Sequence, residues 1–159
     1  MDRRRYPDDF AWDGALREVL VPGATAADWT RFIAWITSGV RPFRFGTAEQ
    51  AMALPDIFAE IATFQRQVIP TLTIDPGGLH LNCHVFAAET IVLDFDPRDV
   101  VSAESVATLS AFVAELGRLL GKPVFVTPEN MPDHPFWRYN PKEDRWSHAS
   151  QRPLVREDR

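Results

Sequence analysis

The sequence predicts an α+β fold: a two-layer sandwich with a mainly antiparallel sheet, a central three-stranded meander and about three helices. Three short segments between residues 71 and 96 alternate apolar and polar side chains and are separated by brief turns, which is typical of antiparallel neighbours. Segments with an apolar residue every three or four positions, which indicate amphipathic helices, lie before and after this region. The 159 residues, 45% of them hydrophobic, suit one domain with its own core.

The first elements are expected to be a strand, a helix and a second strand. The first strand covers residues 15–21, which are β-branched near their end and are followed by Pro-Gly. The helix runs from Thr25 to Gly39, and Asp28 follows Thr25 at the spacing of a capping box. Residues 43–45 alternate between a proline and a glycine, which predicts a short strand.

A second helix, expected over 56–69, leads into the meander, whose strands are expected at 71–74, 79–86 and 90–96. Strict alternation assigns each strand a core face and an outward face. The residues expected to face the core are Leu72, Ile74, Leu79, Leu81, Cys83, Val85, Ile91, Leu93 and Phe95. Those expected to face outward are Thr71, Thr73, His80, Asn82, His84, Phe86, Val92, Asp94 and Asp96.

Loop lengths predict which outward residues face each other across the meander. With residues 75–78 and 87–89 as the two loops, Asn82 is expected opposite Asp94. In the same register His80 is expected opposite both Thr73 and Asp96.

A third helix over 102–121 and a strand over 124–127 follow the meander. Ser102 can cap this helix, and Gly121 stands where a left-handed residue ends it. Beyond it lies an arm rich in proline and aromatic residues, in which regular structure is not expected. The predicted organisation is an N-terminal extension over 1–14, one domain over 15–146 that includes the arm, and a frayed polar tail over 147–159.

The formal net charge of −5 is concentrated in one part of the chain. Six acids lie between residues 75 and 104, and only Arg98 opposes them there. Such a surface repels phosphate, so nucleic acid is not an expected partner, whereas a basic protein would be attracted. The alternative interpretation is a solvated acidic surface that aids solubility.

The outward face of the meander is a second candidate site, in which His80, Asn82 and His84 could meet a ligand. A hydroxyl, an imidazole and a carboxylate in one row suggest a hydrolase, but a flat sheet offers no oxyanion hole. His80 and His84 are four residues apart on a strand, roughly 13 Å at about 3.3 Å per residue, so no shared metal ion is expected. No cofactor motif is present either.

The arm is the third candidate, because aromatic residues are enriched in binding hot spots and prolines stiffen a loop. Its acids are Glu129 and Asp133, and its aromatics include Trp137 and Tyr139. The alternative interpretation is that these aromatics fold back and cover the core.

The segment Leu93-Asp94-Phe95-Asp96-Pro97-Arg98-Asp99 forms an acidic central hairpin in a small chain with one cysteine, Cys83, and a meander followed by a helix. In these features the chain resembles small bacterial immunity proteins, cytosolic partners that neutralise toxins delivered by neighbouring cells. The resemblance covers roughly residues 15–141. Such families share no catalytic residues, so it implies an architecture and a protein partner, with no residue carried over.

Together these observations predict a non-enzymatic protein-binding domain, an immunity protein that holds a basic toxin domain in the cytoplasm. A lone cysteine fits that reducing compartment, and no apolar run approaches the roughly 20 residues that span a bilayer. The expected partner-binding residues are Asp94, Asp96, Asp99, Glu129, Asp133, Trp137 and Tyr139. Two alternatives stay open: a small enzyme or ligand-binding domain that uses His80, His84 and Asp96, and a self-associating homodimer.

Overall fold

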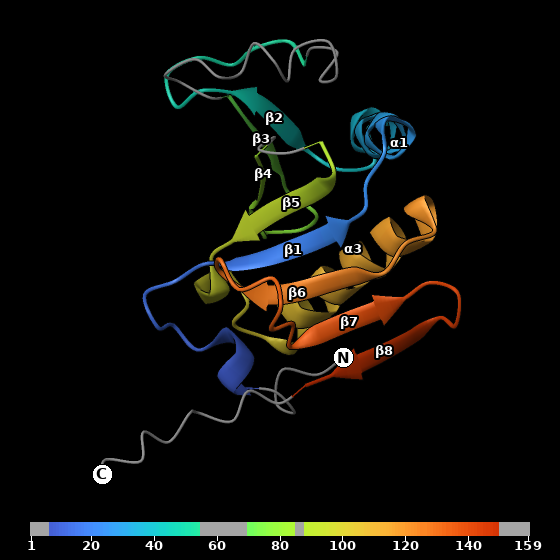
Figure 1. Cartoon of the computed structure of the whole chain (residues 1–159). Helices are drawn as coiled ribbons and strands as arrows, with labels where there is room; N and C mark the ends of the chain where they lie inside the picture. Colours follow the sequence, from blue (N-terminus) through green and yellow to red (C-terminus); the bar gives the residue numbers. More distant parts are fainter. Residues whose placement is uncertain (1–6, 55–69, 85–87, 150–159) are drawn as a thin grey trace.

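The computed structural model describes residues 7–54, 70–84 and 88–149. They form one open antiparallel sheet of eight strands in the order β2-β3-β4-β5-β1-β6-β7-β8 (Figure 1). The strands are β1 Arg17–Pro22, β2 Phe43–Gly46, β3 Thr71–Ile74, β4 Leu81–Cys83, β5 Thr90–Phe95, β6 Val124–Pro128, β7 Trp137–Asn140 and β8 Arg145–His148. The predicted α+β class, antiparallel sheet and central β3-β4-β5 meander are therefore confirmed.

The faces of the meander agree with the alternation read from the sequence. Every expected core-facing residue in the described ranges is buried, while Val85 and Phe86 lie outside the described residues. The expected pairing of Asn82 with Asp94 is confirmed. The expected pairing of His80 with Thr73 is wrong, because Thr73 lies opposite Asn82 and β4 begins only at Leu81.

The longer β3–β4 connection explains this shift of register. The Asp75 carboxylate accepts hydrogen bonds from the backbone N–H groups of Gly77 and Gly78, at 2.8 and 2.5 Å. Both glycines have positive φ, 141° and 82°, a conformation that costs a glycine little. Leu79 is fully buried before pairing begins, so the turn includes two residues that alternation alone assigned to the strand.

Two helices lie in the described part of the chain, α1 (Ala26–Thr37) and α3 (Ala103–Leu120). Thr25 and Asp28 form the predicted capping box at the start of α1. Ser102 caps α3, and Gly121 ends it in the left-handed conformation. The helix expected over 56–69 lies outside the described residues.

The core lies between these two helices and one face of the sheet. Apolar side chains of α1 and α3 and the inward residues of the strands form a single buried cluster. The two helices meet where Trp35 packs against Phe112, with ring centroids 5.2 Å apart, and α3 runs behind β6 in Figure 1. We call the opposite face of the sheet, which carries Leu20 and Asp94, the outer face.

Residues 7–14, expected as an extension, are attached to the sheet. Phe10 is 2% exposed and its ring packs edge-on against Trp137, at 5.1 Å between centroids. The buried Arg17 guanidinium donates to the carbonyl oxygens of Asp9 and Ala11, at 2.9 and 2.8 Å. The edge of the core therefore does not coincide with the boundary expected at residue 15.

The C-terminal arm contains the β7–β8 hairpin, so the expectation of no regular structure there is wrong. Three of the four prolines that motivated it stand in the connections: Pro132 and Pro135 lie between β6 and β7, and Pro141 lies in the hairpin turn, while Pro128 is the last residue of β6. Proline disrupts a strand where the sheet needs the backbone N–H that proline lacks, and a connection between strands needs no such donor. The hairpin also includes Ser147 and His148 of the expected tail.

We predict that Gly117→Ala destabilises the protein by about 1–3 kcal/mol, because the added Cβ would lie 2.7 Å from the ring of the buried Tyr139. Helix propensity alone predicts the opposite sign, a gain of about 1 kcal/mol for alanine inside a helix. Urea unfolding measures the change, and a stabilised variant would contradict the close packing of α3 on β7.

Candidate functional site

Three chain segments rich in acids meet at one end of the sheet. Arg17 at the start of β1 pairs with Phe95 at the end of β5 and with Pro128 at the end of β6. The segments next to these residues therefore lie together, on the left in Figure 1. We call this surface the acidic end; its carboxylates belong to Asp13, Glu18, Asp96, Asp99, Glu129 and Asp133.

Two of these carboxylates bind the backbone of a neighbouring segment. Glu129 accepts from the Leu16 N–H at 3.2 Å, and Glu18 accepts from the Asn130 N–H at 3.3 Å. Burial raises the pKa of Glu18, and the nearby charges of Glu129 and Asp94 raise it further, although the Asn130 hydrogen bond opposes this. The inner part of the acidic end is therefore crowded with like charge, which a basic group would relieve.

Asp96 and Arg98 form a local ion pair on the rim of this surface. The Asp96 carboxylate accepts from the Arg98 backbone N–H at 2.8 Å and from its guanidinium at 2.6 Å. These hydrogen bonds lower the pKa of Asp96, chiefly through the Arg98 side chain. The same guanidinium stacks on the ring of Trp12, 4.0 Å from its centroid. The Asp96 charge is thus largely matched within the chain.

Asp99 and Asp133 are the acids of this surface that remain most available. Asp99 lies 3.5 Å from the exposed ring of His80, and Asp133 is exposed in the connection between β6 and β7. Of the predicted acids, Asp96, Asp99, Glu129 and Asp133 follow β5 or β6, whose ends flank the start of β1. Asp94 lies within β5 and belongs to the polar row on the outer face.

Exposed apolar side chains accompany the carboxylates. Trp12 is 47% exposed and Met131 is 44% exposed, and both stand in segments of the acidic end. Trp137 and Tyr139, expected to bind a partner, are instead 1% and 0% exposed and belong to the core. That expectation is corrected because β7 turns both rings inward; the Tyr139 hydroxyl donates to Asp144 at 2.5 Å.

Sequence reasoning missed Trp12 and Met131, and no pattern in the sequence marks them. Each stands outside a periodic segment, and its exposure depends on where the chain beyond it packs. Phe10 is buried in the core, whereas Trp12, only two residues later, is exposed.

A polar row crosses the outer face of the meander. Thr73 donates to Asn82 at 3.0 Å, and the Asn82 amide donates to Asp94 at 3.1 Å. His84 Nε2 lies 2.7 Å from the other oxygen of Asp94. Asn82, His84 and Asp94 are thus brought together, whereas His80 and Asp96 lie outside the row, so the alternative site is not assembled as expected.

The row offers little reactive chemistry among the residues it contains. Cys83, on the same strand, faces the core, and burial together with the Asp94 charge raises its pKa to about 12, so its thiol stays protonated at neutral pH. Within residues 7–54, 70–84 and 88–149, no group of three or more metal-ligand side chains lies close enough to hold an ion. The row is best described as cross-strand pairing on a half-exposed face.

Comparison of the chain with protein-family models, with curated proteins and with solved structures found no match. None of the helices in the described part of the chain is both long and apolar enough to cross a bilayer.

We predict that Asp94→Ala lowers the free energy of unfolding by about 1–3 kcal/mol, because the half-buried Asn82 amide loses its acceptor. A double-mutant cycle with Asn82→Ala, followed by urea unfolding, isolates the pair. The two changes should be less than additive, and strict additivity would show that the row contributes no coupling.

We predict a pH-dependent role for the Asp75 turn. Hydrogen bonds from the Gly77 and Gly78 backbones lower the pKa of Asp75 below its ordinary value. Its stabilising contribution is therefore complete above the ordinary carboxyl pKa and is lost as the pH falls through the lowered one.

The matched variant for this prediction is Asp75→Asn, which keeps the shape and loses the charge. It should be about 1 kcal/mol less stable than the natural chain at neutral pH, and the difference should shrink in acid. Urea unfolding of both chains over a pH series measures it. A difference that stays constant into acid would contradict a role for the ionised carboxylate.

Proposed function

We propose that this protein is a non-enzymatic protein-binding domain, an immunity protein that neutralises a basic toxin domain through its acidic end. The observation that carries the proposal is the meeting of three chain segments that bear carboxylates, two of which also carry the exposed side chains of Trp12 and Met131. A surface of this composition favours a protein partner, because charge guides the encounter while aromatic and methionine side chains supply the buried contact.

The charge balance at the acidic end favours a basic partner. Glu129 and Asp94 both repel Glu18, while Arg98 pairs with Asp96 and Arg17 pairs with Asp13. A lysine or arginine of the partner placed beside Glu18 would relieve this repulsion, and Asp99 and Asp133 offer further carboxylates to a basic surface. Phosphate would increase it, so nucleic acid is not the proposed partner.

The proposed fold is a two-layer sandwich in which helices cover one sheet face and leave the outer face and the acidic end to the partner. The proposed compartment is the cytoplasm, because the single buried thiol of Cys83 needs no oxidising environment. Self-association through an edge strand, β2 or β8, is the alternative, and it predicts a concentration-dependent mass.

The test is binding between the full chain and the separately expressed product of the adjacent gene, followed by calorimetry at low and high salt. We expect tight binding that weakens as salt rises, because ions screen surface charge beyond a Debye length of about 8–10 Å. Trp12→Ala should weaken it by at least about tenfold, the loss typical of an aromatic hot spot. Asp99→Asn combined with Asp133→Asn should mainly slow association.

The matched controls are an acid and an apolar residue away from the acidic end. Glu89→Gln removes an exposed carboxylate at the opposite end of β5, and Val40→Ala removes an exposed apolar side chain. Neither should change the affinity. Equal effects of Glu89→Gln and the Asp99/Asp133 pair would overturn the proposed surface, and sedimentation of the chain alone as a dimer would favour self-association.

A further inference from the structure

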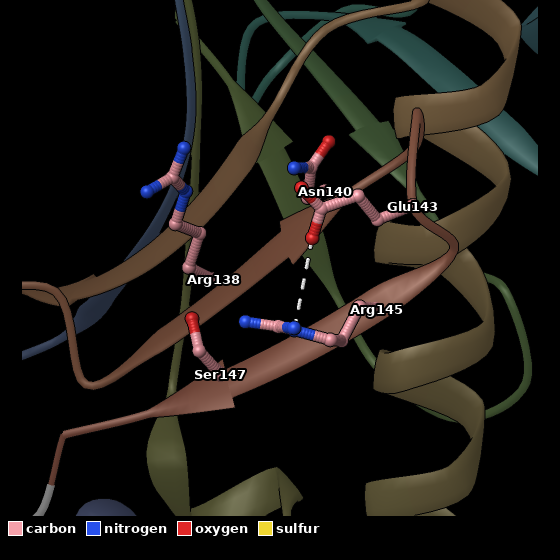
Figure 2. A pocket seen from close by; sticks show the side chains of 5 residues that line it. All are labelled: Arg138, Asn140, Glu143, Arg145 and Ser147. Atoms are coloured by element: carbon pink, nitrogen blue, oxygen red, sulfur yellow. Dashed lines mark ion pairs between the residues drawn. The ribbon is translucent and has the colours of Figure 1, made fainter.

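A polar cavity lies on the outer face of the β7–β8 hairpin, away from the acidic end. It has a volume of about 190 Å³ and is lined by Arg138 and Asn140 of β7, Arg145 and Ser147 of β8, and Glu143 of the turn (Figure 2). The strand residues belong to one face because Arg138 pairs with Ser147 and Asn140 pairs with Arg145. The two arginines are therefore diagonal neighbours, a separation that long side chains can bridge.

Arg138 has an unusual environment for an arginine in this chain. Within the described part of the chain, every other guanidinium lies within 4.0 Å of a carboxylate or carbonyl oxygen of the protein. Arg138 has no such oxygen among the described residues, and its guanidinium stands 5.5 Å from the ring of Phe125. Phe125 is its direct cross-strand neighbour, so the ring helps to hold the cation in place on the outer face.

Arg145 supplies a second charge to the same cavity. Its Nε lies 3.7 Å from a Glu143 oxygen, longer than a hydrogen bond, and both side chains are largely exposed. Figure 2 shows the Arg145 side chain extending from β8 toward β7, whereas the Arg138 guanidinium points away from Arg145, on the side of Phe125. The described lining of the cavity thus contains two cations and one loosely placed carboxylate, with Ser147 and Asn140 as neutral hydrogen-bond donors.

We infer that this cavity binds a small oxyanion, a carboxylate or a phosphate group, between Arg138 and Arg145. Guanidinium groups are donors only and match both oxyanions in a two-point geometry. The Ser147 hydroxyl and the Asn140 amide can donate to further oxygens of the same anion. Among the described residues, Glu143 is the one carboxylate that lines the cavity, and it competes with the ligand for Arg145.

The test is a titration of the full chain with inorganic phosphate and, separately, with acetate, read from the arginine Nε–Hε signals by NMR. Chloride at matched ionic strength is the reference. Phosphate, acetate or both should shift the Arg138 and Arg145 signals with saturation at millimolar concentration, and the stronger of the two identifies the preferred oxyanion. Shifts that chloride reproduces, or no saturable shift, would overturn the inference.

Variants distinguish a built site from general attraction to positive charge. Arg138→Gln and Arg145→Gln should each raise the dissociation constant by at least about tenfold, because a charge-assisted hydrogen bond is lost. Glu143→Gln should lower it, since the competing carboxylate is gone. Arg31→Gln, an exposed arginine on α1, is the matched control and should leave the affinity unchanged.

All four substitutions replace exposed side chains, and thermal unfolding checks that each variant is folded. Equal weakening by Arg31→Gln, or tighter binding in Arg145→Gln than in Glu143→Gln, would contradict the assignment. The hairpin turn lies at the opposite end of the sheet from the acidic end, so failure here leaves the proposed partner surface untouched.

Discussion

The whole structure depends on the pairing of β1 with both β5 and β6. This strand stands near the start of the chain, yet it joins the meander on one side to the C-terminal strands on the other. Without it the sheet would consist of two smaller parts with exposed inner edges, an arrangement that invites aggregation. The buried Arg17 guanidinium at the start of β1 also binds the carbonyl groups of residues 9 and 11, which attaches the N-terminal segment to the same place.

That pairing also creates the acidic end. Because neighbouring strands are antiparallel, the start of β1 lies beside the ends of β5 and β6, and the acids that follow those strands come together there. Charge that is spread over more than a hundred positions in the sequence thus becomes one surface. Some of these carboxylates bind groups of the chain itself, as Asp96 and Glu129 do, and exposed Trp12 and Met131 stand in the same segments.

The two halves of the outer face carry side chains of opposite charge. The half formed by β4, β5 and β1 presents carboxylates, as at Asp94 and Glu18, whereas the half formed by β7 and β8 presents Arg138 and Arg145. A basic protein and a small oxyanion would therefore be attracted to different regions of the same sheet. The two proposed sites share no residue.

The sequence by itself determined the local elements, because their causes are local. Alternation set the faces of the meander, and the capping box at Thr25 and Asp28 set the start of α1. It also identified most acids of the candidate surface, since charge can be counted without a structure. Alternation could not set the β3–β4 register, which depends on the backbone that Asp75 binds.

Only the tertiary structure decided which aromatic residues are covered. From the sequence, Trp137 and Tyr139 are predicted to be binding residues in a proline-rich arm. In the structure, the pairing of β7 with β6 turns both rings into the core, while Trp12 stays exposed. Burial depends on contacts between segments distant in sequence, and no local pattern encodes them. The cavity between Arg138 and Arg145 arises in the same way, because it exists only when β7 and β8 lie side by side.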